Sequence, residues 1–336
     1  MNGLTLHVDA DRWRHHIMHF VARYHGNLVP VIKGNGYGFG LPTLAREAAN
    51  FSAAVVACYN VDEAAVIRSQ FAGDVLLLSP TERLDEDWII HTIAPISETF
   101  ENNAPKRFLL EMLSPVYRHG FAVSEIAPAL ADFGKTGKCL GIAIHLPINQ
   151  KSSMVKWIDE QLKKLDTEKI SSDLYDNTIW VSHLTAEDLT TLKNLWPTIR
   201  WKNRIGTDLW LGARTSLTAT ATVIDRHRLT AGARIGYRQL APGKGWLLIV
   251  AGGTGQGIGL EFPNGGLKNL IKSGLRLFGW NPSPYSWNGK ALAFAEAPHM
   301  HNSLLYIGAD KAPEVGEEIG LTVRFTTTSF DEIVFE

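Results

Sequence analysis

Residues 31–40, VIKGNGYGFG, decide the fold, because a buried apolar strand ends there in a lysine and a glycine-rich turn. In a parallel α/β barrel, the active site lies at the carboxyl ends of the strands. A partly desolvated lysine at such an end has a lowered pKa and can act as a nucleophile or a base. Glycine backbone after it can approach an anion closely. The stretch therefore indicates a reactive strand end at Lys33, and a surface lysine before a flexible turn is the alternative.

Strands and helices alternate through the first two-thirds of the chain. Strands are expected at residues 4–10, 27–34, 53–59, 74–80, 108–113, 139–147 and 177–184. Helices are expected at residues 11–25, 41–51, 61–70 and 153–165. Such alternation is typical of a parallel sheet, either open or closed into a barrel. The count comes near eight units by about residue 210, which favours a (β/α)8 barrel.

The composition changes after Ser216. Apolar strand-like runs follow at residues 217–229, 245–253, 291–298, 303–308 and 319–327. Turns rich in Gly, Pro and Asn-Gly separate them, such as WNGK at 287–290, which is typical of hairpins. The fold class is therefore α/β, with an N-terminal (β/α)8 barrel at residues 1–212 and a C-terminal all-β domain at residues 213–336.

Charge and composition exclude several kinds of protein. The chain has 336 residues and a formal net charge of -1, so no global field favours nucleic acid or an anionic membrane. The densest basic run, at 268–280, is typical of a solvated face. No stretch reaches the roughly 18 apolar residues of a membrane helix, and we expect a cytoplasmic protein. Cys58 and Cys139 lie in apolar strands, which predicts buried thiols and neither a disulfide nor a metal site.

The lysine stretch resembles the cofactor segment of the alanine racemase family, which are pyridoxal-phosphate enzymes of fold type III. The family pattern is close to V-V-K-A-N-A-Y-G-H-G, and this chain has Gly at two Ala positions and Phe at the last His. YNVDEAAVIRS at 59–69 and RIGTDLWLGAR at 204–214 resemble later family segments, in the same order. The family fold is a barrel followed by a β-domain, so the resemblance implies a divergent member.

The resemblance implies pyridoxal 5'-phosphate as the cofactor, bound covalently by Lys33. The implied cofactor-binding residues are Lys33, Tyr37, His145, Thr185, Arg204, Gly206 and Thr207. For the hydroxyl at the phosphate, Ser182 is a candidate beside Thr185. Arg204 would face the pyridine nitrogen, and because arginine cannot release its proton, that nitrogen stays unprotonated. The ring is then a weaker electron sink, which favours proton exchange at Cα over transamination.

TAGARIGYRQ at 230–239 resembles the family's entry to the β-domain and places Tyr237 at its tyrosine acid/base. Racemisation needs two bases on opposite faces of one carbanion, here Lys33 and Tyr237. In the family this tyrosine crosses a dimer interface, so the resemblance implies a head-to-tail homodimer. The implied substrate-binding residues are Arg118, Met300 and Thr254.

The substrate pocket departs from the family pattern. Thr254 stands at a family tyrosine that contacts the substrate carboxylate, while Gln256 and His301 stand at two aspartates. The family often has a carbamylated lysine seven residues before the substrate arginine, and Glu111 occupies that place relative to Arg118. A glutamate can pair with a guanidinium in the same way, so we expect a Glu111–Arg118 contact, direct or through one water.

The leading hypothesis is an enzyme that interconverts L- and D-amino acids, with alanine or a bulkier amino acid as its substrate. A cofactor-binding relative without activity is the first alternative, supported by the changes in the substrate pocket. A decarboxylase on the same fold is the second. Such decarboxylases use a cysteine late in the β-domain, and no cysteine follows Cys139.

Overall fold

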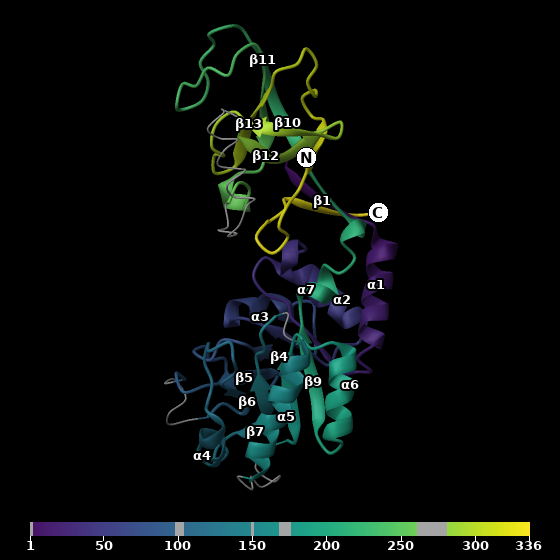
Figure 1. Ribbon diagram of the computed structural model, residues 1–336, viewed down its shortest axis with the longest axis vertical. Helices are drawn as coiled ribbons and strands as arrows, with labels where there is room; N and C mark the ends of the chain where they lie inside the picture. The colour runs from purple at the N-terminus through teal and green to yellow at the C-terminus, as the bar shows by residue number, and fades with distance from the viewer. Residues whose placement is uncertain (1–2, 98–103, 149–150, 168–175, 261–280) are drawn as a thin grey trace. The chain divides into compact units, whose positions relative to one another are not determined.

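The computed structural model describes residues 3–97, 104–148, 151–167, 176–260 and 281–336 (Figure 1). The chain forms two compact units. Unit 1 comprises Met1–Arg14, Tyr37–Gly40 and Ala213–Glu336, and unit 2 comprises His15–Gly36 and Leu41–Gly212. The basic run at 268–280 lies outside the described residues. Among the described residues, no helix has the length and apolar character needed to cross a membrane.

Unit 2 contains a parallel sheet of eight strands in the order β2-β9-β8-β7-β6-β5-β4-β3. The strands are β2 (Leu28–Pro30), β3 (Val55–Cys58), β4 (Asp74–Leu77), β5 (Ile89–Ile93), β6 (Arg107–Met112), β7 (Lys138–Ile144), β8 (Thr178–Ser182) and β9 (Arg200–Ile205). A parallel bridge between Val31 and Ala57 joins the two ends of the sheet. The expected barrel is therefore confirmed.

Helices connect most of these strands. They are α1 (Ala10–Ala22), α2 (Leu41–Asn50), α3 (Val61–Arg68), α4 (Val123–Phe133), α5 (Lys151–Thr167), α6 (Ala186–Leu195) and the short α7 (Thr207–Trp210). Residues 78–88, between β4 and β5, are all described and contain no helix. Local sequence starts α3, where Asn60 accepts a hydrogen bond from the Glu63 amide and acidic side chains occupy the first turn.

The barrel interior is filled by apolar side chains from most of its strands. The cluster comprises Val29, Val31, Ala57, Leu76, Ile90, Leu109, Leu140, Ala143 and Trp180. Each large aliphatic side chain buried there contributes about 1.5–3 kcal/mol. Trp180 also satisfies its indole by donating to the Leu140 carbonyl at 3.1 Å. The packed interior leaves the strand ends as the place for chemistry.

Unit 1 is a second eight-stranded sheet, ordered β11-β14-β13-β12-β15-β10-β1-β16, with an added β10–β11 pairing. Its strands are β1 (Leu4–Val8), β10 (Leu217–Leu229), β11 (Gly245–Ala251), β12 (Pro282–Trp287), β13 (Lys290–Phe294), β14 (Asn302–Ile307), β15 (Glu318–Leu321) and β16 (Glu332–Phe335). Every pairing except β1–β16 is antiparallel. The expected all-β domain is confirmed.

The first strand differs from the expectation that residues 1–212 form the barrel. β1 pairs antiparallel with β10, in a register that sets Leu4 opposite Ala221, and parallel with β16. Leu4 belongs to the core of unit 1. An apolar strand pattern shows that residues 4–8 are buried, but it does not show in which sheet they pair.

The turn expected at WNGK joins β12 to β13. Asn288 and Gly289 have φ values of 48° and 72°, and Trp287 pairs with Lys290. Positive φ at both central residues is the requirement of a type I′ hairpin turn, which Asn-Gly meets best.

Candidate active site

Lys33 lies three residues beyond the end of β2, at the carboxyl end of the barrel. The Ile32 amide just before it donates to the Ala57 carbonyl at 2.7 Å, which fixes the exit of the strand. Gly34 and Gly36 both have φ near +60°. A Cβ at Gly36 would lie 2.8 Å from the Leu41 nitrogen, so alanine does not fit this turn.

The pKa of Lys33 is lowered although part of its side chain reaches solvent. Desolvation by the surrounding protein is the main cause, and the charge of Arg118 adds to it. Glu63 opposes the shift, and Arg204 supports it. The Glu63 carboxylate is held by the amides of Gly34 at 2.7 Å and Tyr59 at 2.6 Å. Lys33 therefore loses its proton at a lower pH than an ordinary lysine does.

Arg204, on β9, forms a buried ion pair with Glu111, on β6. The Arg204 Nη1 lies 3.7 Å from the Glu111 Oε2, and each side chain is 2% exposed. Both point into the barrel, because Glu111 shares its strand face with Leu109 and Arg204 pairs in register with Val29. Burial raises the pKa of Glu111, and the charges of Arg204 and Arg118 oppose that rise.

The expected Glu111–Arg118 contact takes a different form. The ion pair of Glu111 is with Arg204, whereas Arg118 acts on Glu111 through its charge. Arg118 lies on the loop after β6, where its Nη2 is 3.3 Å from the His119 Nε2. That loop leaves the barrel wall, so Arg118 is exposed while Glu111 stays inside.

His145 follows the last residue of β7 and is held as a neutral imidazole. Its Nδ1 lies 3.4 Å from the Ser182 Oγ, and Ser114 donates to its carbonyl. Desolvation, followed by the charges of Arg204 and Arg118, lowers the pKa of His145 to about 3. A neutral, flat ring therefore lies at the barrel mouth at every physiological pH.

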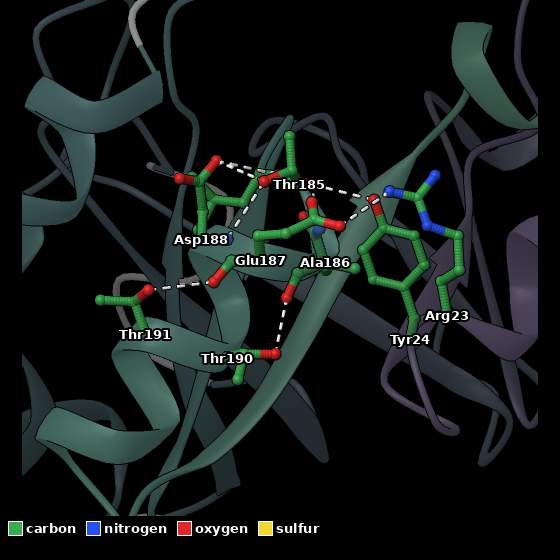
Figure 2. Close-up of polar contacts among 10 residues, drawn as sticks. Arg23, Tyr24, Thr185, Ala186, Glu187, Asp188, Thr190 and Thr191 are labelled. Carbon is green, nitrogen blue, oxygen red and sulfur yellow. Dashed lines mark hydrogen bonds and ion pairs between the residues drawn. The ribbon is translucent and has the colours of Figure 1, made fainter.

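Thr185 caps α6 (Figure 2). Its Oγ1 donates to the Asp188 Oδ2 at 2.7 Å and accepts from the Asp188 amide at 3.1 Å. Ser182 ends β8, and its Oγ accepts from the Leu146 amide at 2.9 Å. Of the two candidate hydroxyls, the one beside His145 is therefore that of Ser182.

The remaining residues that were expected to bind the cofactor lie in two places. Gly206 and Thr207 begin α7, directly after β9, and the first amides of a helix have no acceptor within it. They can therefore donate to an anion. Tyr37 is buried in unit 1, with φ of 54°.

Unit 1 gathers the other predicted site residues. Tyr237 is 87% exposed, and its ring centroid lies 4.8 Å from that of His299. The Thr254 amide donates to the His299 carbonyl at 2.8 Å, and the Gly255 amide donates to the Met300 carbonyl at 2.9 Å. Thr254, Met300 and Tyr237 therefore share one neighbourhood.

Sequence reasoning missed Glu296 and His299, which lie at the centre of this neighbourhood. His299 is 2.6 Å from the Glu296 carboxylate. The available signal was an acidic residue within the apolar run ALAFAEAP at 291–298, since a buried carboxylate needs partners.

The arrangement at the barrel mouth suits an anionic ligand. Lys33, Arg118 and Arg204 supply cations, and the neighbouring imidazoles of His119 and His145 have pKa values lowered to about 4 and about 3. The amides at the start of α7 and the Ser182 hydroxyl add neutral donors. An amine of lowered pKa lies among them, which is the requirement for covalent bonding to a carbonyl group.

Comparison with known proteins gives one family and many related structures. The family model described as "Alanine racemase, N-terminal domain" matches residues 8–184, more than half of the chain. No curated protein sequence matches the chain.

Solved structures resemble the chain over its full length. The alanine racemase from D-cycloserine-producing Streptomyces lavendulae has a TM-score of 0.69 at 17% identity, and the match covers 100% of this chain and 97% of that one. The alanine racemase from E. faecalis has a TM-score of 0.68 at 19% identity, and the match covers 100% of this chain and 98% of that one. The alanine racemase from Bartonella henselae, which has covalently bound pyridoxal phosphate, has a TM-score of 0.70 at 14% identity, and the match covers 100% of both chains. At these identities the structures show a common fold.

Proposed function

The chain belongs to the alanine racemase family, and from that premise we propose that it is an amino-acid racemase that uses pyridoxal 5'-phosphate. The observation that carries the proposal is Lys33, whose pKa is lowered at the end of a barrel strand, near Arg118 and the buried Arg204. A lysine amine of lowered pKa is the group that bonds covalently to a carbonyl cofactor.

The residues present fit this cofactor. The neutral His145 ring offers a flat surface without charge, and the amides of Gly206 and Thr207 together with the Ser182 hydroxyl suit a phosphate. Arg204 suits the ring nitrogen, because its guanidinium keeps its proton. When bound, the cofactor supplies the electron sink that acidifies the Cα proton of the amino acid.

The chain's own groups then move the proton. The Lys33 amine removes or returns it on one face of Cα, and the Tyr237 phenol does so on the other. Both are needed, because a single base would return the proton to the face from which it came. We further propose a cytoplasmic homodimer in which Tyr237 serves the barrel of a second copy.

Alanine or a bulkier amino acid is the proposed substrate. Arg118 is exposed on the loop after β6, where it can bind a carboxylate. Thr254 is several ångströms shorter than a tyrosine, and its hydroxyl donates to the His299 carbonyl at 3.4 Å. Loss of one directed hydrogen bond to a charged group costs roughly 1.5–3 kcal/mol. We therefore expect alanine to be turned over less efficiently than a larger amino acid.

The two alternatives are a cofactor-binding protein without activity and a decarboxylase. Thr254 is exposed and stands where the family has a tyrosine, which favours the protein without activity. A decarboxylase of this fold would need a proton-donating cysteine in the β-domain. Cys58 and Cys139 are instead buried in the barrel strands β3 and β7, and burial raises the pKa of both thiols.

The test begins with cofactor binding. Purified protein with pyridoxal phosphate should show a new visible absorbance band, and borohydride should then fix the cofactor on Lys33, as located by peptide mass. Lys33→Arg should abolish the band. Lys202→Arg is the matched control, because burial also lowers the pKa of Lys202, which lies on β9 beside Gly26, at the opposite end of β2 from Lys33.

Chiral chromatography of an L-amino-acid panel then tests the reaction. Formation of the D-enantiomer that is lost in Lys33→Arg and in Tyr237→Phe supports the racemase. Cofactor bound at Lys33 without turnover of any amino acid would favour the inactive relative. Release of carbon dioxide from the panel would favour the decarboxylase.

A further inference from the structure

Tyr237 lies at the tip of a short, braced turn in unit 1. Ile235 and Leu240 close the turn by exchanging two backbone hydrogen bonds of 2.8 and 2.9 Å. Across the tip, the Gln239 side-chain amide donates to the Gly236 carbonyl at 3.0 Å. The Tyr237 ring nevertheless projects almost entirely into solvent, so the turn alone does not fix its direction.

A buried carboxylate lies directly beneath this tip. The Glu296 side chain is 4% exposed, and its oxygens lie 3.4 Å from the Tyr237 amide and 3.5 Å from the Arg238 amide. Gly236 has φ of 65°, and a Cβ there would lie 2.3 Å from the Glu296 carboxylate. The glycine is therefore what lets the backbone of the tip close onto the acid.

The same carboxylate fixes His299. The His299 Nε2 lies 2.6 Å from the Glu296 Oε1, so the imidazole and the carboxyl group share a hydrogen bond. This bond sets the direction of the ring, whose centroid is 4.8 Å from that of Tyr237 at an interplanar angle of 44°. The His299 carbonyl also accepts from the Thr254 amide. His299 thus contacts both Tyr237 and the Thr254 loop.

We propose that Glu296 and His299 are positioning residues for Tyr237: the buried carboxylate anchors the turn and the imidazole, and the imidazole supports the phenol ring. An exposed aromatic side chain on its own samples several rotamers, and its ring contact with His299 restricts that freedom. The consequence for turnover rests on the proposed racemase function, in which the phenol must meet Cα on one face. A misplacement of about 1 Å can slow such a step about a hundredfold.

The first experiment needs no activity. The eight tyrosines are replaced by 3-fluorotyrosine in the full-length protein, and the Tyr237 fluorine signal is assigned from its loss in Tyr237→Phe. Glu296→Gln and His299→Ala should each shift and sharpen this signal, because the ring becomes free to reorient. His299→Phe retains a ring beside Tyr237 and should restore part of the native shift.

His227→Ala is the matched control. His227 is a second histidine of unit 1 beside a carboxylate, with its Nε2 3.3 Å from the Asp225 Oδ2, but this pair is exposed on β10. The control should leave the Tyr237 signal unchanged. A Tyr237 signal that is the same in the wild type, Glu296→Gln and His299→Ala would overturn the proposal.

The second experiment uses the assembled enzyme with its cofactor and substrate. In a two-base racemase, one enantiomer loses its Cα proton to Tyr237 and the other loses it to Lys33. Glu296→Gln should lower kcat about tenfold to a hundredfold with little change in KM. The primary isotope effect of the Cα-deuterated substrate should rise only for the enantiomer that Tyr237 deprotonates.

An equal change in the isotope effects of both enantiomers would indicate general damage and overturn the positioning role. Absence of turnover by the wild-type protein would instead refute the racemase proposal. The fluorine measurement decides the structural claim in that case as well, so the two failures remain distinct.

Discussion

The charge of the barrel mouth depends on Glu111, the buried carboxyl that pairs with Arg204. Arg204 cannot release its proton in a protein interior, and Glu111 is the carboxylate that lies opposite it at 3.7 Å. Moving two charges from water into the protein interior costs free energy. The attraction within a buried ion pair repays that cost only when its geometry is good. No donor among the described residues hydrogen-bonds to the Glu111 Oε2, which makes the ionised form of this carboxyl less favourable. The contribution of this buried pair to stability therefore depends on pH. An exposed pair contributes little, because solvent screens its charges.

The first prediction concerns this carboxyl. Its pKa is raised by burial, so the folded protein binds a proton more tightly than the unfolded chain does. The stability that follows is present below about pH 4.5 and is lost as pH rises through the folded pKa. Glu111→Gln, which does not titrate, should therefore gain stability relative to the wild type as pH rises, by about 1.4 kcal/mol per unit of raised pKa.

Urea unfolding at a series of pH values measures this difference. Glu187→Gln is the control, because Glu187 pairs with Arg23 at the surface and its pKa is lowered. Its effect should be small and of opposite sign. A Glu111→Gln stability difference that does not vary with pH would show that Glu111 titrates at its ordinary pKa.

The second prediction concerns the imidazoles beside Arg118. Desolvation and then Arg118 lower the pKa of His119 to about 4, and desolvation, Arg204 and then Arg118 lower that of His145 to about 3. Replacing Arg118 by Gln removes one of these charges, so both NMR titration midpoints should rise, by up to about one unit. Arg23→Gln, at the surface pair with Glu187, should move neither. Unchanged midpoints in Arg118→Gln would mean that its charge is fully screened from the mouth.

At the level of elements, apolar periodicity predicted most of the barrel because each strand is buried on both faces. The runs at 74–80, 108–113 and 139–147 correspond to β4, β6 and β7. Turn chemistry predicted the hairpin at Asn288, since few residues tolerate positive φ. Side-chain partners were not predictable in this way. Whether a threonine caps a helix or faces a ligand depends on where the helix starts, and that boundary is among the least certain features of a sequence.

The third prediction separates the two candidate phosphate hydroxyls. Thr185→Ala removes the α6 cap and should lower the free energy of unfolding by about 1 kcal/mol, with cofactor affinity unchanged. Ser182→Ala should weaken cofactor binding about tenfold to a hundredfold, since a hydrogen bond to a charged group is lost. Urea unfolding and cofactor titration by absorbance measure the two quantities. The opposite pattern would assign the phosphate to Thr185.

At the level of the whole molecule, the sequence predicted two domains but not how the chain divides between them. Compositional change marks the start of β10, since the strand pattern alters there. The pairing of β1 with β10 and β16 joins residues more than 200 positions apart, and no local pattern encodes such a contact. The Glu296–His299 pair escaped prediction differently, because its meaning depends on the turn that carries Tyr237.

The loops after the barrel strands carry exposed large apolar side chains. They are Tyr59 after β3, Ile96 after β5, Val116 and Tyr117 after β6, and Ile148 after β7. All lie at the carboxyl end of the barrel, around the proposed site. An apolar rim with polar neighbours is typical of a surface that another protein covers. It supports the proposal that a second copy of the chain binds there.

The fourth prediction tests this assembly by complementation. If Tyr237 of one copy serves the barrel of the other, then each active site of a dimer takes its lysine and its tyrosine from different chains. Lys33→Ala and Tyr237→Phe should each be inactive alone. A heterodimer of the two has one site that carries both substitutions and one site that carries neither. Random mixing makes half of the dimers hetero, so co-refolded protein should regain about a quarter of wild-type activity.

Mixing Lys33→Ala with Lys33→Arg is the control, and it should regain none. If the phenol served the lysine of its own chain, every site would keep one defect, and the mixture of Lys33→Ala and Tyr237→Phe would stay inactive although dimers form.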